Sequence, residues 1–456
     1  MYAAPVIERL GDRLSRIAGR VVPDPLVLAI GLTLVVAVGA ALLLLDTGAA
    51  AGDVPGRLFD GWAAGFSDPA LLSFALQMCL VLVTGHALAL SPPVQAAIAA
   101  LARVPRSAGQ ATMLVAAVSC VAAVIHWGLG AVVGALVARE IGRHATARGT
   151  AIHYPLLGAA AYSGLAVWHG GLSGSAPLKV AEPGHFAADV AGVIPIGETL
   201  LSPLNLAITG GLVVGIPLLC WAMTPRDPAK MVPPSPLPPL PDPAAATPTS
   251  VPELLVESPV VGITIGLVGL ASVLASFAFG NLRFDLNLVN LIFLFLGIAC
   301  QGRLRAYLDA VSDGARGAGA IIVQFPLYFG ILGLMKASGA IAWLSESLTD
   351  LAGAGSFPVI AFFSAAFVNV LIPSGGGQWA VQGELLLSAG NNLGVDPGTT
   401  VMAFSYGDAC TNMLQPFWAL PLLGIMGLRA RDILGYTTIV CVAMAAAVSL
   451  GLLAAG

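Results

Sequence analysis

Long apolar stretches recur along the chain and are separated by short polar segments. Nine of them, at about 20 residues each, could cross the hydrocarbon core of a bilayer as a helix. The predicted spans cover residues 26–45, 69–90, 155–178, 200–223, 258–279, 286–302, 317–336, 400–426 and 433–455. This pattern predicts an all-α polytopic membrane protein.

Two further apolar segments, residues 107–138 and 357–387, are too long for one span. Polar, glycine-rich tips interrupt them at residues 125–130 and 372–379. Non-helical backbone is tolerated at membrane depth only where it is buried in protein or lines a cavity. We therefore expect two re-entrant hairpins whose tips lie inside the protein.

The distribution of basic residues orients these segments, because short cytoplasmic loops collect Lys and Arg. With two re-entrant hairpins and a cytoplasmic N-terminus, 16 of the 20 basic residues fall on the cytoplasmic side. Only Arg57, Lys179, Arg283 and Lys336 then fall outside. The bias weakens if the first hairpin crosses the membrane instead. The charge pattern thus favours the hairpins. The first 25 residues carry four arginines among apolar positions, and because no small-residue cleavage site follows the apolar run we expect an interfacial helix that leads into a retained first span.

A proline-rich segment divides the chain. Eleven prolines lie between residues 225 and 252, and a segment of this kind cannot keep a helix ladder. We interpret residues 224–257 as a semi-extended cytoplasmic linker. It separates an N-terminal repeat, residues 1–223, from a C-terminal repeat, residues 258–456.

The two halves resemble each other. A shift of 247 residues places Gly128 on Gly375, and a shift of 244 places Tyr162 on Tyr406. Each half would hold one hairpin, at 107–138 or 357–387, and one broken helix, at 155–178 or 400–426. The first hairpin would enter from the cytoplasm and the second from outside, so the repeats are predicted to be inverted. Inverted repeats with paired broken elements are typical of secondary transporters.

Composition excludes several other classes of protein. The chain is 57% hydrophobic and only 10% charged, whereas a soluble protein carries about 25% charged residues. The net charge of -4 and the absence of a basic tract argue against a nucleic-acid partner. The six cysteines form no CxxC pair, so neither a zinc site nor a disulfide framework is expected. An intramembrane enzyme is disfavoured because HExxH and GxSxG motifs are missing. We expect no cofactor beyond a coupling ion, H⁺ or Na⁺.

Four interrupted segments are candidates for binding an anion: the two tips and residues 168–177 and 405–416. A helix that restarts at such a break presents free N–H groups and a positive dipole end. The predicted substrate contacts are Ser374, Gly375, Gly376, Gly377, Gln378, Ser173, Ser175, His126, His169, Thr411, Asn412 and Gln415. No Lys or Arg lies in these segments, which favours a weakly held monocarboxylate over a phosphate or a dicarboxylate. The alternative is that the small residues merely let helices pack closely.

Asp408 is the only acidic residue well inside a predicted span. An intramembrane carboxylate is costly and marks a proton or cation site. We expect Asp408 to carry the coupling proton, or to bind Na⁺ together with Thr411, Asn412 and unwound carbonyls; the alternative is a cap for the following half-helix. His126 and His169 each stand beside a tryptophan and are either proton or substrate contacts or structural groups.

Two long motifs, PSGGGQW at 373–379 and QPFWALP at 415–421, resemble those of the short-chain fatty acid transporter family. The resemblance extends to residues 22–26, 83–88 and 171–177 and so covers nearly the whole chain. It implies cation symport of short-chain monocarboxylates such as acetoacetate and butyrate across a bacterial inner membrane. It also implies the inverted-repeat fold of the ion transporter superfamily, with elevator-type movement and a possible homodimer. A dicarboxylate carrier of the same superfamily and a channel remain as alternatives.

Overall fold

The computed structural model describes residues 25–234, 250–415 and 418–455. Within these ranges the regular elements are all helical. Seven described helices are long and apolar enough to cross a membrane; their apolar stretches cover Ala29–Asp46, Pro69–Ala89, Ala108–Ile125, Pro203–Met223, Pro259–Ala278, Leu304–Ser338 and Ala430–Ala454. The predicted all-α membrane fold is confirmed.

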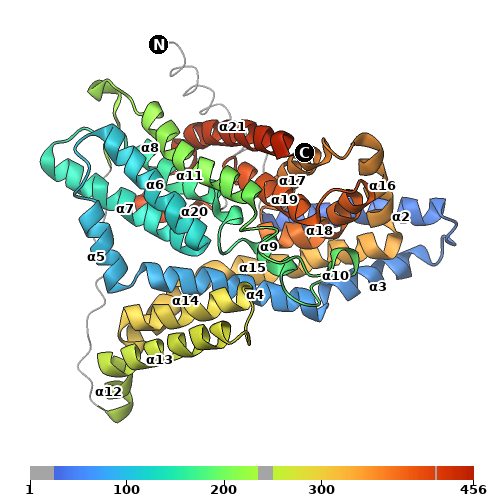
Figure 1. Cartoon of the computed structure of the whole chain (residues 1–456), viewed down its shortest axis with the longest axis horizontal. Coiled ribbons are helices and arrows are strands. Elements are labelled where there is room, and N and C mark those ends of the chain that lie inside the picture. The colour runs from blue at the N-terminus through green and yellow to red at the C-terminus, as the bar shows by residue number, and fades with distance from the viewer. Residues whose placement is uncertain (1–24, 235–249, 416–417, 456) are drawn as a thin grey trace.

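Six helices form one layer, which we call the scaffold; Figure 1 draws four of them in its lower part and α2 and α3 at the right. They are α2 (Pro25–Asp46), α3 (Val54–Phe66), α4 (Pro69–Ala89), α13 (Pro259–Ala278), α14 (Leu286–Gln301) and α15 (Leu304–Ser338). The long α15 packs along α2, α3 and α4, and α14 contacts both α4 and α13. Glycines permit part of this packing, because a Cβ at Gly65 in α3 would lie 2.9 Å from the Cα of Gly333 in α15.

Ten further helices form the second layer, which we call the hairpin layer (Figure 1). In the first half they are α6 (Ala108–Ile125), α7 (Trp127–Arg148), α8 (Tyr154–Tyr162), α9 (Ser175–Val180) and α11 (Pro203–Met223). In the second half they are α17 (Phe357–Leu371), α18 (Gly375–Asn392), α19 (Pro397–Asn412), α20 (Leu420–Met426) and α21 (Ala430–Ala455). Both halves thus contain two helices that meet at a tip, then a helix, an interruption, a short helix and a long helix.

At each tip one residue adopts an extended backbone, and its side chain caps the helix that follows. His126 is extended (φ -161°, ψ 118°), and its Nδ1 accepts the Leu129 N–H at 3.4 Å. Ser374 is likewise extended (φ -155°, ψ 107°), and its Oγ accepts the Gly377 N–H at 3.4 Å. Side-chain caps of this kind satisfy N–H groups that would otherwise be unpaired at a helix start. The predicted helix–tip–helix segments are therefore present in both halves, although whether they are re-entrant in a bilayer remains a prediction.

Most helix ends agree with the predicted spans to within a few residues. The exception is α15, which begins at Leu304 instead of residue 317. Charged residues lower the hydropathy of its first turns without preventing helix formation. The hydropathy pattern also missed several short helices: α3, α5 (Pro92–Leu101), α10 (Ala188–Ala191), α12 (Val251–Glu257) and α16 (Ala340–Leu351). The predicted N-terminal interfacial helix and the middle of the predicted linker lie outside the described residues.

The second predicted break is wrong in its position. The break was expected at 405–416, but α19 continues to Asn412 and α20 begins only at Leu420. No proline occurs between Gly398 and Gln415, so each backbone N–H can stay in the helix ladder. Gly407 serves close packing, because a Cβ there would collide with the carbonyl oxygen of Phe362 in α17. In the first half, α8 already gives way after Tyr162 to 3₁₀ turns at Ser163–Ala166 and Trp168–Gly170, so the first broken helix is confirmed.

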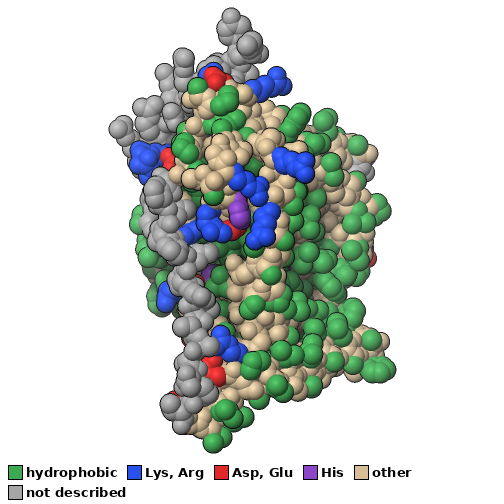
Figure 2. Space-filling model, turned by 90° about the vertical axis from the view of Figure 1, so that its left-hand side faces the viewer, with side chains coloured by type: hydrophobic (Ala, Val, Ile, Leu, Met, Phe, Trp, Pro, Cys, Tyr) green, Lys and Arg blue, Asp and Glu red, His purple; other side chains and the backbone are tan. Residues whose placement is uncertain are grey.

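Lys and Arg side chains gather on the end of the molecule where α6 begins and α7 ends (Figure 2). Glu140 near the end of α7 contacts Arg143 and, at 3.3 Å, His144. This gathering of charge is consistent with the predicted cytoplasmic side. The orientation of the N-terminus stays a prediction.

Candidate functional site

A pocket with an empty volume of about 370 Å³ lies where the second hairpin tip meets the scaffold. Its lining residues are Met78, Trp127, Leu165, Trp168, Ile321, Phe325, Ser374, Gly375, Gly376, Asn412 and Trp418. The lining is mostly apolar, and Ser374 and Asn412 supply its polar side chains. No Lys or Arg is among these lining residues.

Hydrogen bonds tie each hairpin tip to the interruption in its own half. In the first half, the Trp127 N–H donates to Ser173 Oγ at 2.9 Å. In the second half, Trp418 Nε1 donates to the Pro373 carbonyl oxygen at 2.7 Å. Each tip is thus held by a side chain from the irregular segment of its own half.

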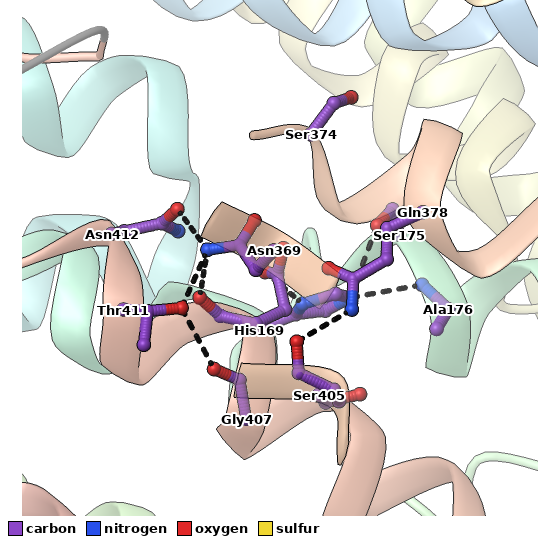
Figure 3. A network of polar contacts seen from close by, with 12 residues as sticks. His169, Ser175, Ala176, Asn369, Ser374, Gln378, Ser405, Gly407, Thr411 and Asn412 are labelled. Carbon is purple, nitrogen blue, oxygen red and sulfur yellow. Dashed lines mark hydrogen bonds and ion pairs between the residues drawn. The ribbon is translucent and has the colours of Figure 1, made fainter. Parts of the chain in front are cut away.

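Next to the pocket, His169 joins the two halves through Asp408. His169 Nδ1 lies 2.7 Å from Asp408 Oδ2, and neither side chain is exposed to solvent. On its other side, His169 Nε2 accepts the Ala176 N–H at 3.2 Å and lies 3.0 Å from Ser175 Oγ (Figure 3). A backbone N–H can only donate, so Nε2 carries no proton and Nδ1 carries one. The hydrogen-bond pattern therefore assigns a neutral imidazole that donates to the carboxylate of Asp408.

Asn369 of α17 holds the end of α19 from the other side (Figure 3). Its Nδ2 donates to the Asp408 carbonyl oxygen at 2.8 Å, and to Thr411 Oγ1 and Asn412 Oδ1 at 3.0 Å each. Gln378 of α18 is oriented similarly, because its Nε2 donates to the Ala365 carbonyl oxygen at 2.7 Å. These donors fix which atom of each amide is nitrogen.

Three buried side-chain oxygens in this region have no hydrogen-bond partner within the described part of the chain. They are Asp408 Oδ1, Asn369 Oδ1 and Gln378 Oε1. A buried acceptor without a partner is unfavourable by about 1–3 kcal/mol, and such atoms are rare unless an ion, water or ligand uses them. Carboxylate and amide oxygens are also the ligands that hard cations prefer.

The structure brings only some of the predicted contacts to the pocket. Ser374, Gly375, Gly376 and Asn412 line it directly. His169 and Ser175 lie behind it in the Asp408 network. The remaining predicted residues, described next, are used inside the fold: Gly377, Gln378, Ser173, His126, Thr411 and Gln415.

Each of these remaining residues has a structural partner. A Cβ at Gly377 would lie 2.7 Å from the Tyr328 ring, so this glycine permits close packing. Gln415 Nε2 donates to the Asn369 carbonyl oxygen at 2.6 Å. The His126 ring packs on the Phe293 ring with centroids 4.0 Å apart, which places it against α14 of the scaffold.

The unwound carbonyls predicted beside Thr411 and Asn412 need a correction, whereas the role of these two side chains as cation ligands stays a prediction. Both belong to the continuous helix α19, so the unwound carbonyls expected beside them are absent from this described segment. Thr411 Oγ1 donates to the Ala366 carbonyl oxygen at 2.9 Å and is therefore already used between α19 and α17.

Sequence reasoning missed Asn369 and the burial of Lys179. Asn369 is the only amide side chain in α17, which was a usable signal. The charge pattern predicts only that Lys179 lies on the non-cytoplasmic side; in the structure it is 4% exposed and lies 2.7 Å from Glu182. Gln77 of α4 donates to the same carboxylate at 3.0 Å. No local pattern indicates this contact, since its partners are far apart in the chain.

Comparisons with known proteins agree on one kind of transporter. The family model described as "Short chain fatty acid transporter" matches residues 6–454. A protein of Escherichia coli K12 named "Putative short-chain fatty acid transporter" is 40% identical over 434 residues, which is 94% of this chain and 96% of that protein. A protein of the same name from Haemophilus influenzae is 37% identical over 441 residues, with the same coverage.

Among solved structures, the Alcanivorax borkumensis YdaH transporter, which is described as having an unusual topology, has a similar fold. The TM-score is 0.60 at 16% identity, and the alignment covers 95% of this chain and 97% of that one. At this identity the similarity concerns the fold alone.

Proposed function

This chain belongs to the short-chain fatty acid transporter family, and from that premise we propose that it carries short-chain monocarboxylates across a bacterial inner membrane by cation-coupled alternating access. The observation that supports this most is the pocket between the second hairpin tip and the scaffold, which combines an apolar lining with a small polar side. A short acyl chain with one carboxylate has this same division into apolar and polar parts.

We place the carboxylate at the N-terminal end of α18. Gly375 and Gly376 form the first turn of this helix and line the pocket. First-turn N–H groups and the helix dipole attract an anion, and Ser374 and Asn412 can add hydrogen bonds. This set of donors holds one negative charge weakly enough for release. A dicarboxylate would require a second set of donors or a cation, and no Lys or Arg is among the pocket-lining residues.

We place the coupling cation at Asp408. Its Oδ2 is occupied by the neutral His169, whereas its Oδ1 has no partner within the described residues. Either a proton on Oδ1, or Na⁺ shared with Asn369 Oδ1 and Gln378 Oε1, would satisfy it. Asn369 also donates to Asn412, which lines the pocket. A cation bound at Asp408 and Asn369 would therefore influence the substrate contact at Asn412. This link is our explanation for coupled binding.

The movement we propose is elevator-type. The pocket lies between the two layers, so displacement of the hairpin layer along the scaffold would carry the bound substrate from one side of the membrane to the other. The buried Lys179–Glu182 pair, bridged to the scaffold by Gln77, is the polar contact that this movement must break or carry along.

Uptake by proteoliposomes tests the proposal. Labelled butyrate and acetoacetate are supplied with a proton gradient or a sodium gradient imposed separately, and succinate is supplied as the dicarboxylate control. We expect saturable accumulation of the monocarboxylates with one of the two gradients and none of succinate. Transport of succinate at the same rate, or linear uptake that no gradient drives, would contradict the proposed carrier.

A further inference from the structure

Both layers line the substrate pocket, and the hairpin layer supplies Trp127, Leu165, Trp168 and Trp418 as well as the polar side chains. The polar side, with Ser374 and Asn412, belongs to the hairpin layer. The opposite side is formed by Met78 of α4 and by Ile321 and Phe325 of α15, all in the scaffold. These three side chains are 4%, 3% and 2% exposed, so they form a buried apolar wall.

Aromatic packing holds the wall in place. The Phe325 ring lies edge-on to Phe329, with centroids 5.8 Å apart, and 6.4 Å from the ring of Phe74. Phe74 is fully buried, and Lys179 Nζ lies 5.3 Å from its ring centroid. Close-packed aromatic side chains have few alternative rotamers, and enlarging a ligand against them forces strain. Phe325 is therefore a firm boundary for a bound molecule.

The same wall approaches the hairpin tip closely. A Cβ added to Gly376 would lie 2.9 Å from Phe74 Cζ and 3.2 Å from Phe325 Cε2. The distance between the carboxylate side of the pocket and its apolar wall is thus set by the contact between the two layers.

We propose that Met78, Ile321 and Phe325 determine the longest acyl chain that the transporter accepts. This inference rests on the proposed function, because it takes the carboxylate to be anchored at Gly375 and Gly376. From that anchor the tail has to lie among the apolar side chains. Each methylene buried there strengthens binding about fourfold, until the chain meets the wall, beyond which a longer chain loses affinity. The scaffold side chains therefore limit the length of the acyl chain, whereas the first turn of α18 in the hairpin layer holds the carboxylate.

Competition experiments with a graded series of acids test this assignment. Unlabelled straight-chain acids from acetate to octanoate compete with labelled butyrate in proteoliposomes of the wild type and of Phe325→Ala, Phe325→Leu, Met78→Ala and Ile321→Phe. Phe325→Ala and Met78→Ala should improve hexanoate relative to butyrate by about fourfold or more, one methylene's worth of binding. Phe325→Leu should shift the ranking the same way by less, and Ile321→Phe should shift it toward acetate.

Phe357→Leu is the matched control, because Phe357 of α17 is a fully buried phenylalanine that belongs neither to the pocket lining nor to the aromatic contacts of Phe325. It should leave the ranking of acids unchanged. Variants that transport butyrate with the wild-type ranking would overturn the inference and leave the proposed function standing. If Phe325→Ala does not accumulate in the membrane, Phe325→Leu and Ile321→Phe decide the question. A wild type that takes up no monocarboxylate would instead remove the proposed function.

Discussion

The substitution Asp408→Asn tests whether this carboxylate couples transport to a cation, because it should remove the coupling while the protein still folds. Asp408 and His169 are both fully buried, and their side chains meet at 2.7 Å. Removing one partner of such a pair costs about 3–5 kcal/mol. The asparagine oxygen can still accept the His169 Nδ1–H, so the change replaces a charged acceptor by a neutral one. A charge-assisted hydrogen bond contributes about 1.5–3 kcal/mol and a neutral one about 1 kcal/mol, which leaves an expected loss of about 0.5–2 kcal/mol.

We expect the variant to fold and to lose gradient-driven accumulation, because an amide at position 408 can neither take up a proton nor offer a negative charge to Na⁺. Exchange of labelled for unlabelled butyrate, which needs no net cation movement, should persist. The assay compares driven uptake with exchange in the same proteoliposomes. Asp408→Ala should lower thermal stability much more, because it leaves the buried His169 N–H without an acceptor.

Asp313→Asn is the control for this experiment. Asp313 in the scaffold also pairs with a histidine, His86, at 2.9 Å, but its side chain is 48% exposed and lies away from the pocket. It should retain both activities. Wild-type accumulation by Asp408→Asn would refute the assignment of the coupling site.

Three further predictions concern packing, a buried charge and pH. Gly407→Ala should abolish uptake and lower the melting temperature, because its Cβ would meet the Phe362 carbonyl oxygen and push α19 from α17. Lys179→Met should destabilise the purified protein by about 3–5 kcal/mol, because it leaves the buried carboxylate of Glu182 unpaired. The pKa of His153 is lowered by burial from its ordinary value of 6.5, and its Nδ1 accepts a backbone N–H of the linker. Its contribution to stability is present above pH 6.5 and is lost as the pH falls toward the lowered pKa. A melting temperature that falls more steeply in the wild type than in His153→Gln below pH 6.5 is the expected result.

Matched controls accompany these three predictions. Gly215→Ala on α11 meets nothing within 4 Å and should melt like the wild type. The double variant Lys179→Met/Glu182→Gln should recover much of the stability lost in the single one, since no unpaired charge stays buried. Equal stability of the single and double variants would contradict the explanation that the buried Glu182 carboxylate is destabilising without Lys179. Identical pH profiles of the wild type and His153→Gln would contradict the third prediction.

Local patterns in the sequence were sufficient for the spans, the two tips and the small polar residues at Ser374, Gly375 and Gly376. Hydropathy and helix-breaking residues act over one or two turns, so their effect on structure can be predicted from neighbouring residues in the sequence. The same reasoning misplaced the second break, because Gly407 looks like an interruption in sequence and is a packing contact in the structure.

The sequence by itself determined a helical membrane protein with paired interruptions, a motif-based family resemblance and one intramembrane carboxylate. Only the tertiary structure decided what surrounds that carboxylate, since His169 and Asp408 are 239 residues apart. It also decided that Lys179 is buried and that α4 and α15 close the pocket. These contacts depend on which helix faces meet, and that choice is made by shape and burial over the whole molecule. No single stretch of sequence carries that information.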